Sequence, residues 1–334
     1  MKRALLQKKK ENELVQCLNC AHLCLVDEGG FGICKMRQNK NGELKVCNYG
    51  KVAALNIDPI EKKPLYHFLP GTESLSLGVP GCSFNCKNCQ NWSLSQKKKE
   101  DINGRRLSPA NIVKIAKDKK LKSISYTYSE PIIFLEYALD IMTKAKKEGI
   151  KNVWVSNGYF SDLSLQKILP YIDAINIDLK SFSKNFYKDV CNGRLEPVLD
   201  AIKKIQKDDD TWLELTTLLI PGYNDDTSEI TDMARFIADL DKDIPWHLSR
   251  FSSRFSKDMK DIPDTPMETM EKAYRIAKNA GLNYVYQGNV VNGKTDTHCP
   301  KCNFTVIQRE NYKTKRFDEK DCCPDCNRKV KLIN

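Results

Sequence analysis

Three cysteines carry the clearest chemistry in this sequence. Cys82, Cys86 and Cys89 lie within residues 78–91 at the spacing C-x3-C-x2-C. Thiolates hold iron–sulfur clusters, and a cubane takes four of them when it is fully ligated. Three thiolates, with no fourth close downstream, would leave one iron with an open position, and an open position marks a reactive metal site. A structural zinc loop or a C-x2-C redox pair are the alternatives.

A second group of cysteines lies near the start of the chain. Cys17, Cys20, Cys24 and Cys34 follow the pattern C-x2-C-x3-C-x9-C, which can close a tetrahedral shell. We expect a structural zinc site that holds together a segment too small for its own core. A second, electron-carrying iron–sulfur cluster and unmetallated buried cysteines are the alternatives. His22 can replace one thiolate, although a supporting or surface role suits it better.

The third group lies in the tail. Cys299, Cys302, Cys323 and Cys326 are spaced C-x2-C-x20-C-x2-C, which is typical of a zinc ribbon. Cys322 is then spare. A closed site of this kind is structural, and ribbons can also dock protein or RNA.

Composition sets the class of protein. The chain has 334 residues, of which 41% are hydrophobic and 29% charged, as in ordinary globular proteins. No apolar run reaches the roughly 18–20 residues of a membrane span, and no secretion signal is visible. Grouped cysteines without such a signal indicate a reducing cytoplasm. A net charge of +11 can indicate binding to nucleic acid. One iron–sulfur cluster and two zinc sites on thiolates would carry negative charge and lower the net charge to about +6. The composition therefore does not require a nucleic-acid partner.

Strands and helices alternate from Ser74 onward, which predicts an α/β fold with a parallel sheet. About six strand–helix units and one closing strand are fewer than the eight of a full barrel, so we expect an open, partial (β/α)6 barrel. Residues 1–16 are expected to form a polar tail or short helix, and residues 43–57 a hairpin. Residues 58–71 are either a rigid loop at the mouth of the active site or a linker. The predicted strands are 74–78, 122–128, 152–156, 174–178, 212–219, 246–251 and 283–287.

Polar residues gather where these strands end. In a parallel barrel the chemistry lies at the carboxyl ends of the strands. The candidates there are Ser129, Glu130, Asn157, Asp178, Lys180, His247 and Arg250. Glu130 can instead stabilise the start of a helix, His247 can be a hydrogen-bonded core histidine, and Arg254 is expected on the surface.

The cysteine motif after a short strand resembles that of the radical S-adenosylmethionine (radical SAM) superfamily. The resemblance implies a [4Fe–4S] cluster on Cys82, Cys86 and Cys89 that binds SAM and cleaves it reductively to a 5′-deoxyadenosyl radical. Ser129 and Glu130 take the place of a Gly-Gly-Glu turn that holds the SAM amino group. Ser156-Asn157-Gly158 and Asp178-Leu179-Lys180 resemble SAM-contacting turns of pyruvate formate-lyase activating enzymes. His247 resembles a SAM-contacting histidine of that branch, and Arg250 would hold the SAM carboxylate or an anionic substrate.

Four further stretches carry a second resemblance: the four-cysteine group at 17–34, residues 58–68, residues 126–131 and residues 284–289. Through them the chain, over residues 17–326, is similar to the radical SAM member of the AmmeMemoRadiSam system. Relatives carry a His-Pro pair where Ser252-Ser253 stands here, which leaves the substrate open. We expect an N-terminal unit at 1–72, a barrel at 73–292 and a zinc-ribbon tail at 293–334. The expected partners are a flavodoxin- or ferredoxin-type electron donor and a small-molecule or protein substrate. Activation of a glycyl radical enzyme, or a zinc-rich nucleic-acid-binding module, are the alternative functions.

Overall fold

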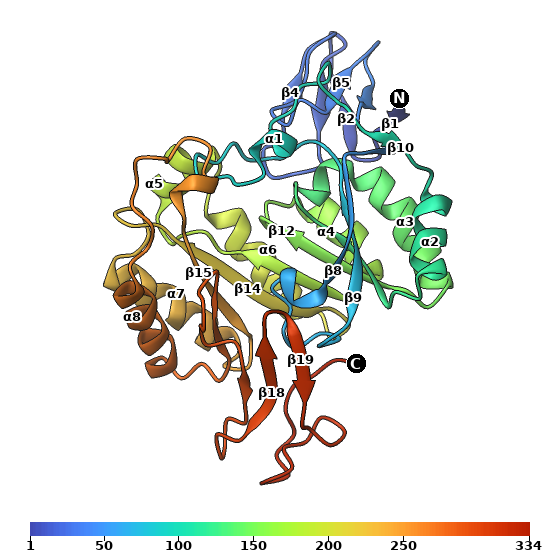
Figure 1. Ribbon diagram of the computed structural model, residues 1–334. Helices are drawn as coiled ribbons and strands as arrows, with labels where there is room; N and C mark the ends of the chain where they lie inside the picture. Colours follow the sequence, from blue (N-terminus) through green and yellow to red (C-terminus); the bar gives the residue numbers. More distant parts are fainter.

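Seven parallel strands and one antiparallel edge strand form the main sheet of the computed structural model, which describes residues 1–334 (Figure 1). Six crossovers join the parallel strands, which confirms the expected parallel α/β architecture. The sheet stays open, with β16 and β8 at its edges. Its order is β16 (Val285–Gly288), β15 (Trp246–Arg250), β14 (Trp212–Leu219), β13 (Ala174–Asp178), β12 (Lys151–Ser156), β11 (Ser123–Tyr126), β9 (Glu73–Gly78) and β8 (Ala54–Pro59).

Helices connect the parallel strands. Capping residues set where they start: Ser108 and Asn111 form a capping box at α2. The α-helices are α1 (Trp92–Ser95), α2 (Pro109–Asp118), α3 (Leu135–Lys147), α4 (Asp162–Ile168), α5 (Lys184–Phe186), α6 (Glu196–Gln206), α7 (Thr227–Leu240) and α8 (Met267–Asn279). Short 3-10 turns are η1 (Ile60–Lys62), η2 (Pro131–Phe134), η3 (Leu169–Tyr171) and η5 (Ser253–Phe255), and η4 (Tyr187–Cys191) is a π-turn.

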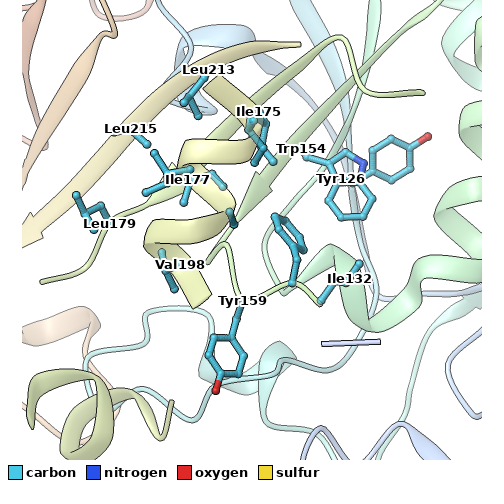
Figure 2. Close-up of a cluster of buried hydrophobic side chains, with 14 of the residues drawn as sticks. Tyr126, Ile132, Trp154, Tyr159, Ile175, Ile177, Leu179, Val198, Leu213 and Leu215 are labelled. Carbon is cyan, nitrogen blue, oxygen red and sulfur yellow. The ribbon is translucent and has the colours of Figure 1, made fainter. Parts of the chain in front are cut away.

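Alternation along each strand separates the packed core from the site. Successive side chains of a strand point to opposite faces. On β13, Ile175 and Ile177 are buried toward the helices, and Figure 2 shows Ile177 beside Val198 of α6. Asn176 and Asp178 alternate with them and line a cavity on the other face. On β14 the same alternation directs Leu213 and Leu215 into the core and Thr216 to the cavity.

The N-terminal unit is built from very short strands and not from the expected tail or helix. Residues 1–16 contribute β1 (Lys2–Arg3), β2 (Gln7–Lys9) and most of β3 (Val15–Cys17). The predicted hairpin over 43–57 is also wrong, because its halves pair with other strands and β8 joins the main sheet. The remaining strands here are β4 (Leu25–Val26), β5 (Arg37–Asn39), β6 (Leu44–Val46), β7 (Lys51–Val52) and β10 (Arg105–Arg106).

One buried ion pair fastens this unit to the barrel. Arg37 donates from both terminal nitrogens to the two carboxylate oxygens of Glu136 on α3, each at 2.9 Å. Both side chains are almost completely buried. A bidentate pair of this kind fixes orientation as well as charge.

The tail forms a three-stranded sheet at the opposite end of the molecule from the N-terminal unit (Figure 1). Cys299, Val306 and Leu332 pack with Tyr66 and Tyr286 in a separate small core. The tail therefore seals one end of the barrel. Its strands are β17 (Thr297–His298), β18 (Thr305–Glu310) and β19 (Lys313–Arg316).

Candidate active site

A cavity of about 1170 Å³ opens at the carboxyl ends of the parallel strands. It brings together the three cysteines of the C-x3-C-x2-C motif and all but one of the strand-end residues that the sequence analysis selected. The cavity is lined by Cys82, Cys86, Cys89, Ser129, Glu130, Asn157, Asp178, Lys180 and Arg250. Arg254, which we expected on the surface, also lies at its rim.

The cysteine loop surrounds its sulfur atoms with hydrogen-bond donors. The backbone N–H of Phe84 lies 3.4 Å from Cys82 Sγ, and the Asn157 amide lies 3.7 Å from the same sulfur and 3.0 Å from Ser83 Oγ. The Ser95 hydroxyl lies 3.4 Å from Cys89 Sγ. Such donors stabilise thiolates that carry a cluster.

The three thiols fit an iron–sulfur cluster. None is in a disulfide, and they do not gather within 4.8 Å of one another, as the tail cysteines do. Thiolates on separate irons of a cubane lie further apart than thiolates that share one ion. Gly81 lets the loop turn: its φ is +119°, and an added Cβ would lie 2.6 Å from the Met36 side chain.

Glu130 joins two strand ends and caps a helix. Its carboxylate accepts from the Asn157 N–H at 2.8 Å, the Ser156 hydroxyl at 2.8 Å and the Ile132 N–H at 3.2 Å. Burial raises the pKa of Glu130 to about 7, although the N–H of Asn157 and the hydroxyl of Ser156 oppose the shift. Glu130 therefore caps η2, as one interpretation of the sequence expected, and it also lines the cavity.

Tyr128 adopts a left-handed backbone conformation that is usual for glycine. Its φ is +66°, in the left-handed region that glycine adopts most easily. The hydroxyl donates to Asp58 and accepts from the Asn56 amide at 3.1 Å. Ser129 Oγ donates to the carbonyl of Val79, which ties the turn to the cysteine loop.

Asp178 and Lys180 form an ion pair at 2.9 Å on the cavity wall. The N–H of Lys180 donates to the Tyr187 hydroxyl at 3.1 Å, which fixes the backbone there. Arg250 donates from Nε to the carbonyl of Thr265 at 2.7 Å, so its remaining nitrogens are available to the cavity.

The structure does not bring His247 to this cavity. Its Nε2 donates to Glu214 at 2.7 Å, and both side chains are buried. His247 and Ser249 share a face of β15, but only Ser249 lines the cavity. His247 therefore lies one layer deeper, and the alternative of a hydrogen-bonded core histidine describes its place.

Four polar residues on or beside β8 and η1 also line the cavity, and none of them was named individually as a candidate from the sequence. They are Asn56, Asp58, Lys62 and Lys63. Lys63 forms a buried ion pair with Asp58 at 2.7 Å and lies over the ring of Tyr128. The first part of the segment 58–71 therefore lies at the site, as one of its two interpretations expected, whereas residues 65–69 are buried and Tyr66 packs with the tail.

Cys191 is a second residue near the site that the sequence analysis did not select, because it belongs to none of the spaced cysteine groups. In the structure it is fully buried, and the N–H of Asn85, the neighbour of Cys86, donates to its carbonyl at 3.0 Å. No sequence pattern connects two residues so far apart, and only the folded barrel brings them together.

The N-terminal thiols pack against the cysteine loop of the barrel. Cys20 forms a β-bridge with Phe160, and His22 Nε2 lies 2.8 Å from the carbonyl oxygen of Ser83. His22 thus links the two loops. Cys17, Cys20, Cys24 and Cys34 lie near enough to influence one another electrostatically, but not within 4.8 Å as a group.

The tail thiols form a tighter set. Sγ of Cys299 lies 3.5 Å from that of Cys326, and Sγ of Cys302 lies 3.5 Å from that of Cys323. All four sulfurs lie within 4.8 Å of one another. A tetrahedral zinc with Zn–S bonds of about 2.3 Å places its sulfurs about 3.8 Å apart, so this group could hold one metal ion.

Comparison with known proteins identifies the family. The family model described as Radical SAM superfamily matches residues 77–237. An uncharacterized protein of Methanocaldococcus jannaschii is 40% identical over 338 residues, covering 100% of both chains. A putative glycyl-radical enzyme activating enzyme of the same organism is 31% identical over 54% of this chain and 68% of its own. The chain belongs to the radical SAM superfamily.

Its place is in the branch that resembles pyruvate formate-lyase activating enzymes. A solved domain of such an enzyme from Bacteroides vulgatus shares 20% identity and a TM-score of 0.44, over 49% of this chain and 98% of that one. As a radical SAM enzyme, the protein belongs to a family that uses a [4Fe–4S] cluster and SAM, and the cysteine loop fits that cluster. None of its helices is long and apolar enough to span a membrane.

Proposed function

We propose that the protein cleaves SAM reductively at a [4Fe–4S] cluster held by Cys82, Cys86 and Cys89. A reduced cluster held by these thiolates would supply the one electron needed to cleave SAM to methionine and a 5′-deoxyadenosyl radical, which would abstract hydrogen from the substrate. The observation that carries this proposal is the convergence of the three thiols with polar strand-end residues on one cavity.

The protein's own residues would position SAM. Glu130 and the backbone of the turn at Ser129 face the cavity and suit the SAM ammonium group, while Lys180 and Arg250 suit its carboxylate. Asn157 holds the cysteine loop through Ser83. The cavity is larger than the 300–1000 Å³ typical of small-molecule sites, so it has room for SAM and a second molecule.

We propose that the chain is the radical SAM member of the AmmeMemoRadiSam system, acting on a small molecule or protein and reduced by a flavodoxin- or ferredoxin-type donor. Anaerobic reconstitution with iron and sulfide, reduction in the presence of SAM, and chromatography test the first step. Formation of 5′-deoxyadenosine supports the proposal, and its absence from a cluster-loaded sample contradicts it.

Activation of a glycyl radical enzyme is the second candidate, favoured by the names of several relatives. Two of them are an isethionate sulfite-lyase activating enzyme and a (2S)-3-sulfopropanediol dehydratase activating enzyme, 23% and 26% identical over about a third of this chain. Incubation with a candidate partner should then give a glycine-centred electron paramagnetic resonance signal. No such signal with any candidate partner would exclude this function.

We further propose zinc at the four tail thiols and a metal at the four N-terminal thiols, within the division 1–72, 73–292 and 293–334. Assignment of β8 to the sheet moves residues 54–59 to the barrel. At the four N-terminal thiols we propose zinc, with a second, electron-carrying iron–sulfur cluster as the alternative. This unit lies on the cysteine loop, where an electron would enter.

Metal analysis separates these assignments. Replacement of both Cys302 and Cys326 by Ala should remove about one zinc per chain and leave iron unchanged. Replacement of both Cys24 and Cys34 by Ala should lower iron if the N-terminal site holds a cluster, and lower zinc if it does not. Unchanged zinc in the tail variant would contradict the ribbon assignment.

Binding of SAM should weaken in acid. The pKa of Glu130 is about 7, and the ammonium group of SAM binds better to the ionised carboxylate. Below pH 7 the carboxyl group carries a proton, which must be lost when SAM binds, and this loss weakens the affinity. We expect the affinity to fall up to tenfold per unit between about pH 7 and pH 6, and to level off near pH 8. Titration calorimetry on cluster-loaded protein measures it. Glu130→Gln should remove the pH dependence, whereas Glu100→Gln, at an exposed position, should not.

A further inference from the structure

A pair of lysines lines the cavity on a side that none of the proposed SAM contacts occupies. Lys62 ends η1, Lys63 follows it, and Asp58 lies beside them on β8. The residues proposed to position SAM lie at or after the carboxyl ends of β11, β12, β13 and β15. The two sets therefore share one cavity but come from different elements.

The register of the edge strand separates these sets in depth. β8 runs antiparallel to β9, with Ala54 opposite Gly78 and Asp58 opposite Ser74. Gly78 ends β9, directly before the cysteine loop. Four residues of a β-strand span about 13 Å. The Asp58 backbone therefore lies well below the strand ends at which the cluster cysteines and the SAM residues gather.

The chain beyond Lys63 crosses the inner end of the cavity. The carbonyl of Pro64 accepts from the Asn176 amide of β13 at 2.8 Å, and the amide oxygen of Asn176 accepts from the Thr216 hydroxyl at 2.9 Å. All three residues line the cavity. Asn176 precedes Asp178 by two residues on the same face of β13. This crossing therefore lies one layer beneath the ion pair proposed to position SAM.

The two lysines share one carboxylate. Lys63 Nζ donates to Asp58 at 2.7 Å, and its side chain is buried. The Tyr128 hydroxyl donates to the same carboxylate oxygen. Lys62 Nζ lies 3.4 Å from the other oxygen, and its side chain is 47% exposed. Lys63 is thus fixed, whereas the Lys62 ammonium has room for a further partner.

No second acid neutralises this group. Glu61 precedes Lys62, but its carboxylate accepts from the N–H of Gly71 at 2.8 Å and from the Thr314 hydroxyl at 2.9 Å, on the side of the tail. Asp58 is the only acidic residue that β8 and η1 contribute to the cavity lining. Two ammonium groups for one carboxylate leave one positive charge at the cavity, which attracts an anion.

The position of the Tyr128 ring shows that the group is specifically built. Tyr128 has a φ of +66°, and backbone strain of this kind is concentrated at functional sites. A Cβ at position 78 would lie 3.0 Å from the Tyr128 ring, so Gly78 makes room for it. The ring can therefore extend from the end of β11 across β9 to Asp58 on β8.

We propose that Lys62, backed by Lys63 and Asp58, binds a carboxylate or phosphate group of the substrate. Lysine is a point cation that suits either group. SAM's own carboxylate is served by Lys180 and Arg250. The acidic group would then lie low along β8, and the carbon that loses hydrogen would belong to the other end of the molecule, toward the cysteine loop. This inference rests on the proposed function, for which it names a substrate class.

A purely structural role for Lys62 makes a different demand. Its Nζ also lies 5.8 Å from the ring centroid of Tyr312 in the tail, near the outer limit of a cation–π contact. If Lys62 served only to hold the tail, Lys62→Gln would lower the thermal midpoint and leave anion affinity unchanged.

The test is titration calorimetry of pyrophosphate, and separately of succinate, into anaerobically reconstituted, oxidised protein that holds SAM. We expect at least one of these anions to bind, and Lys62→Gln to lower its affinity about three- to tenfold. The thermal midpoint and the SAM affinity should not change. Lys147→Gln, at an exposed position on α3, should match wild type. Tighter binding of pyrophosphate indicates a phosphate group, and tighter binding of succinate a carboxylate.

Absence of binding by both anions overturns the proposal, as does equal affinity in Lys62→Gln and wild type. An equal loss in Lys147→Gln would also overturn it, because the effect would then reflect overall charge. The titration needs neither reduction nor cleavage of SAM. Failure of this inference is therefore distinguishable from failure of the proposed reaction, which is read from 5′-deoxyadenosine.

Discussion

Cys86→Ala is expected to abolish 5′-deoxyadenosine formation, by at least about a thousandfold, or about 4 kcal/mol of barrier. Cys86 is the middle ligand of the motif and lies on the cavity wall, so its loss leaves two irons without a thiolate. The cluster should then fail to assemble. Iron content, the resonance signal of the reduced protein and chromatography of the products measure this.

The matched control is Cys47→Ala. Cys47 is buried in the N-terminal unit, and no cysteine group includes it. It should keep its iron and full turnover. If Cys86→Ala still cleaved SAM, the cluster assignment would be lost; if Cys47→Ala lost its iron, the effect would be a general consequence of removing thiols.

Glu214→Ala should cause the largest loss of stability among single substitutions outside the cavity, about 3–5 kcal/mol. Four donors converge on this carboxylate within 3.0 Å: the N–H groups of Tyr66 and His67, the Trp212 ring and His247. Alanine leaves all of them buried without an acceptor. Denaturant unfolding, followed separately from cluster absorbance, measures the free energy of unfolding.

Acid should remove the same stabilisation. Burial raises the pKa of Glu214, but the hydrogen bond and charge of His247 outweigh it, so the pKa is lowered below 4.5. A lowered acid pKa stabilises the fold above the unfolded value and loses that contribution as pH falls through the folded one. Glu100→Ala, at an exposed site, should change stability by no more than about 0.5 kcal/mol. A Glu214→Ala protein as stable as that control would refute the buried-network account.

Long buried strands could be predicted because their signals are local. The expected bounds of 174–178 and 212–219 match β13 and β14. Apolar residues there alternate with residues that line the cavity, and turn residues mark the ends. The N-terminal strands of two or three residues carry no such period, and contacts far away in sequence hold them together. A tail or helix was therefore the wrong expectation.

Most of the candidate site was predictable for the same reason, since strand ends meet at one edge. The sequence could not show how far each side chain lies from the cavity. His247 and Ser249 belong to the same face of one strand, yet Ser249 lines the cavity and His247 is hydrogen-bonded to Glu214 beneath it. Nor could it give contacts made across the fold. Asp58, on the antiparallel edge strand β8, and Lys63, just after η1, both line the cavity, and Cys191, at the end of the π-turn, accepts through its carbonyl from Asn85 in the cysteine loop.

The Arg37–Glu136 pair limits how the enzyme can open. A hinge motion of the N-terminal unit would separate two charges that water does not reach, at a cost of several kcal/mol. A substrate should therefore enter a cavity whose N-terminal wall stays in place, past the rim residues Ser252 and Phe255. The size of the molecule admitted would then depend on side chains at this rim, such as the exposed Phe255, and not on domain rotation.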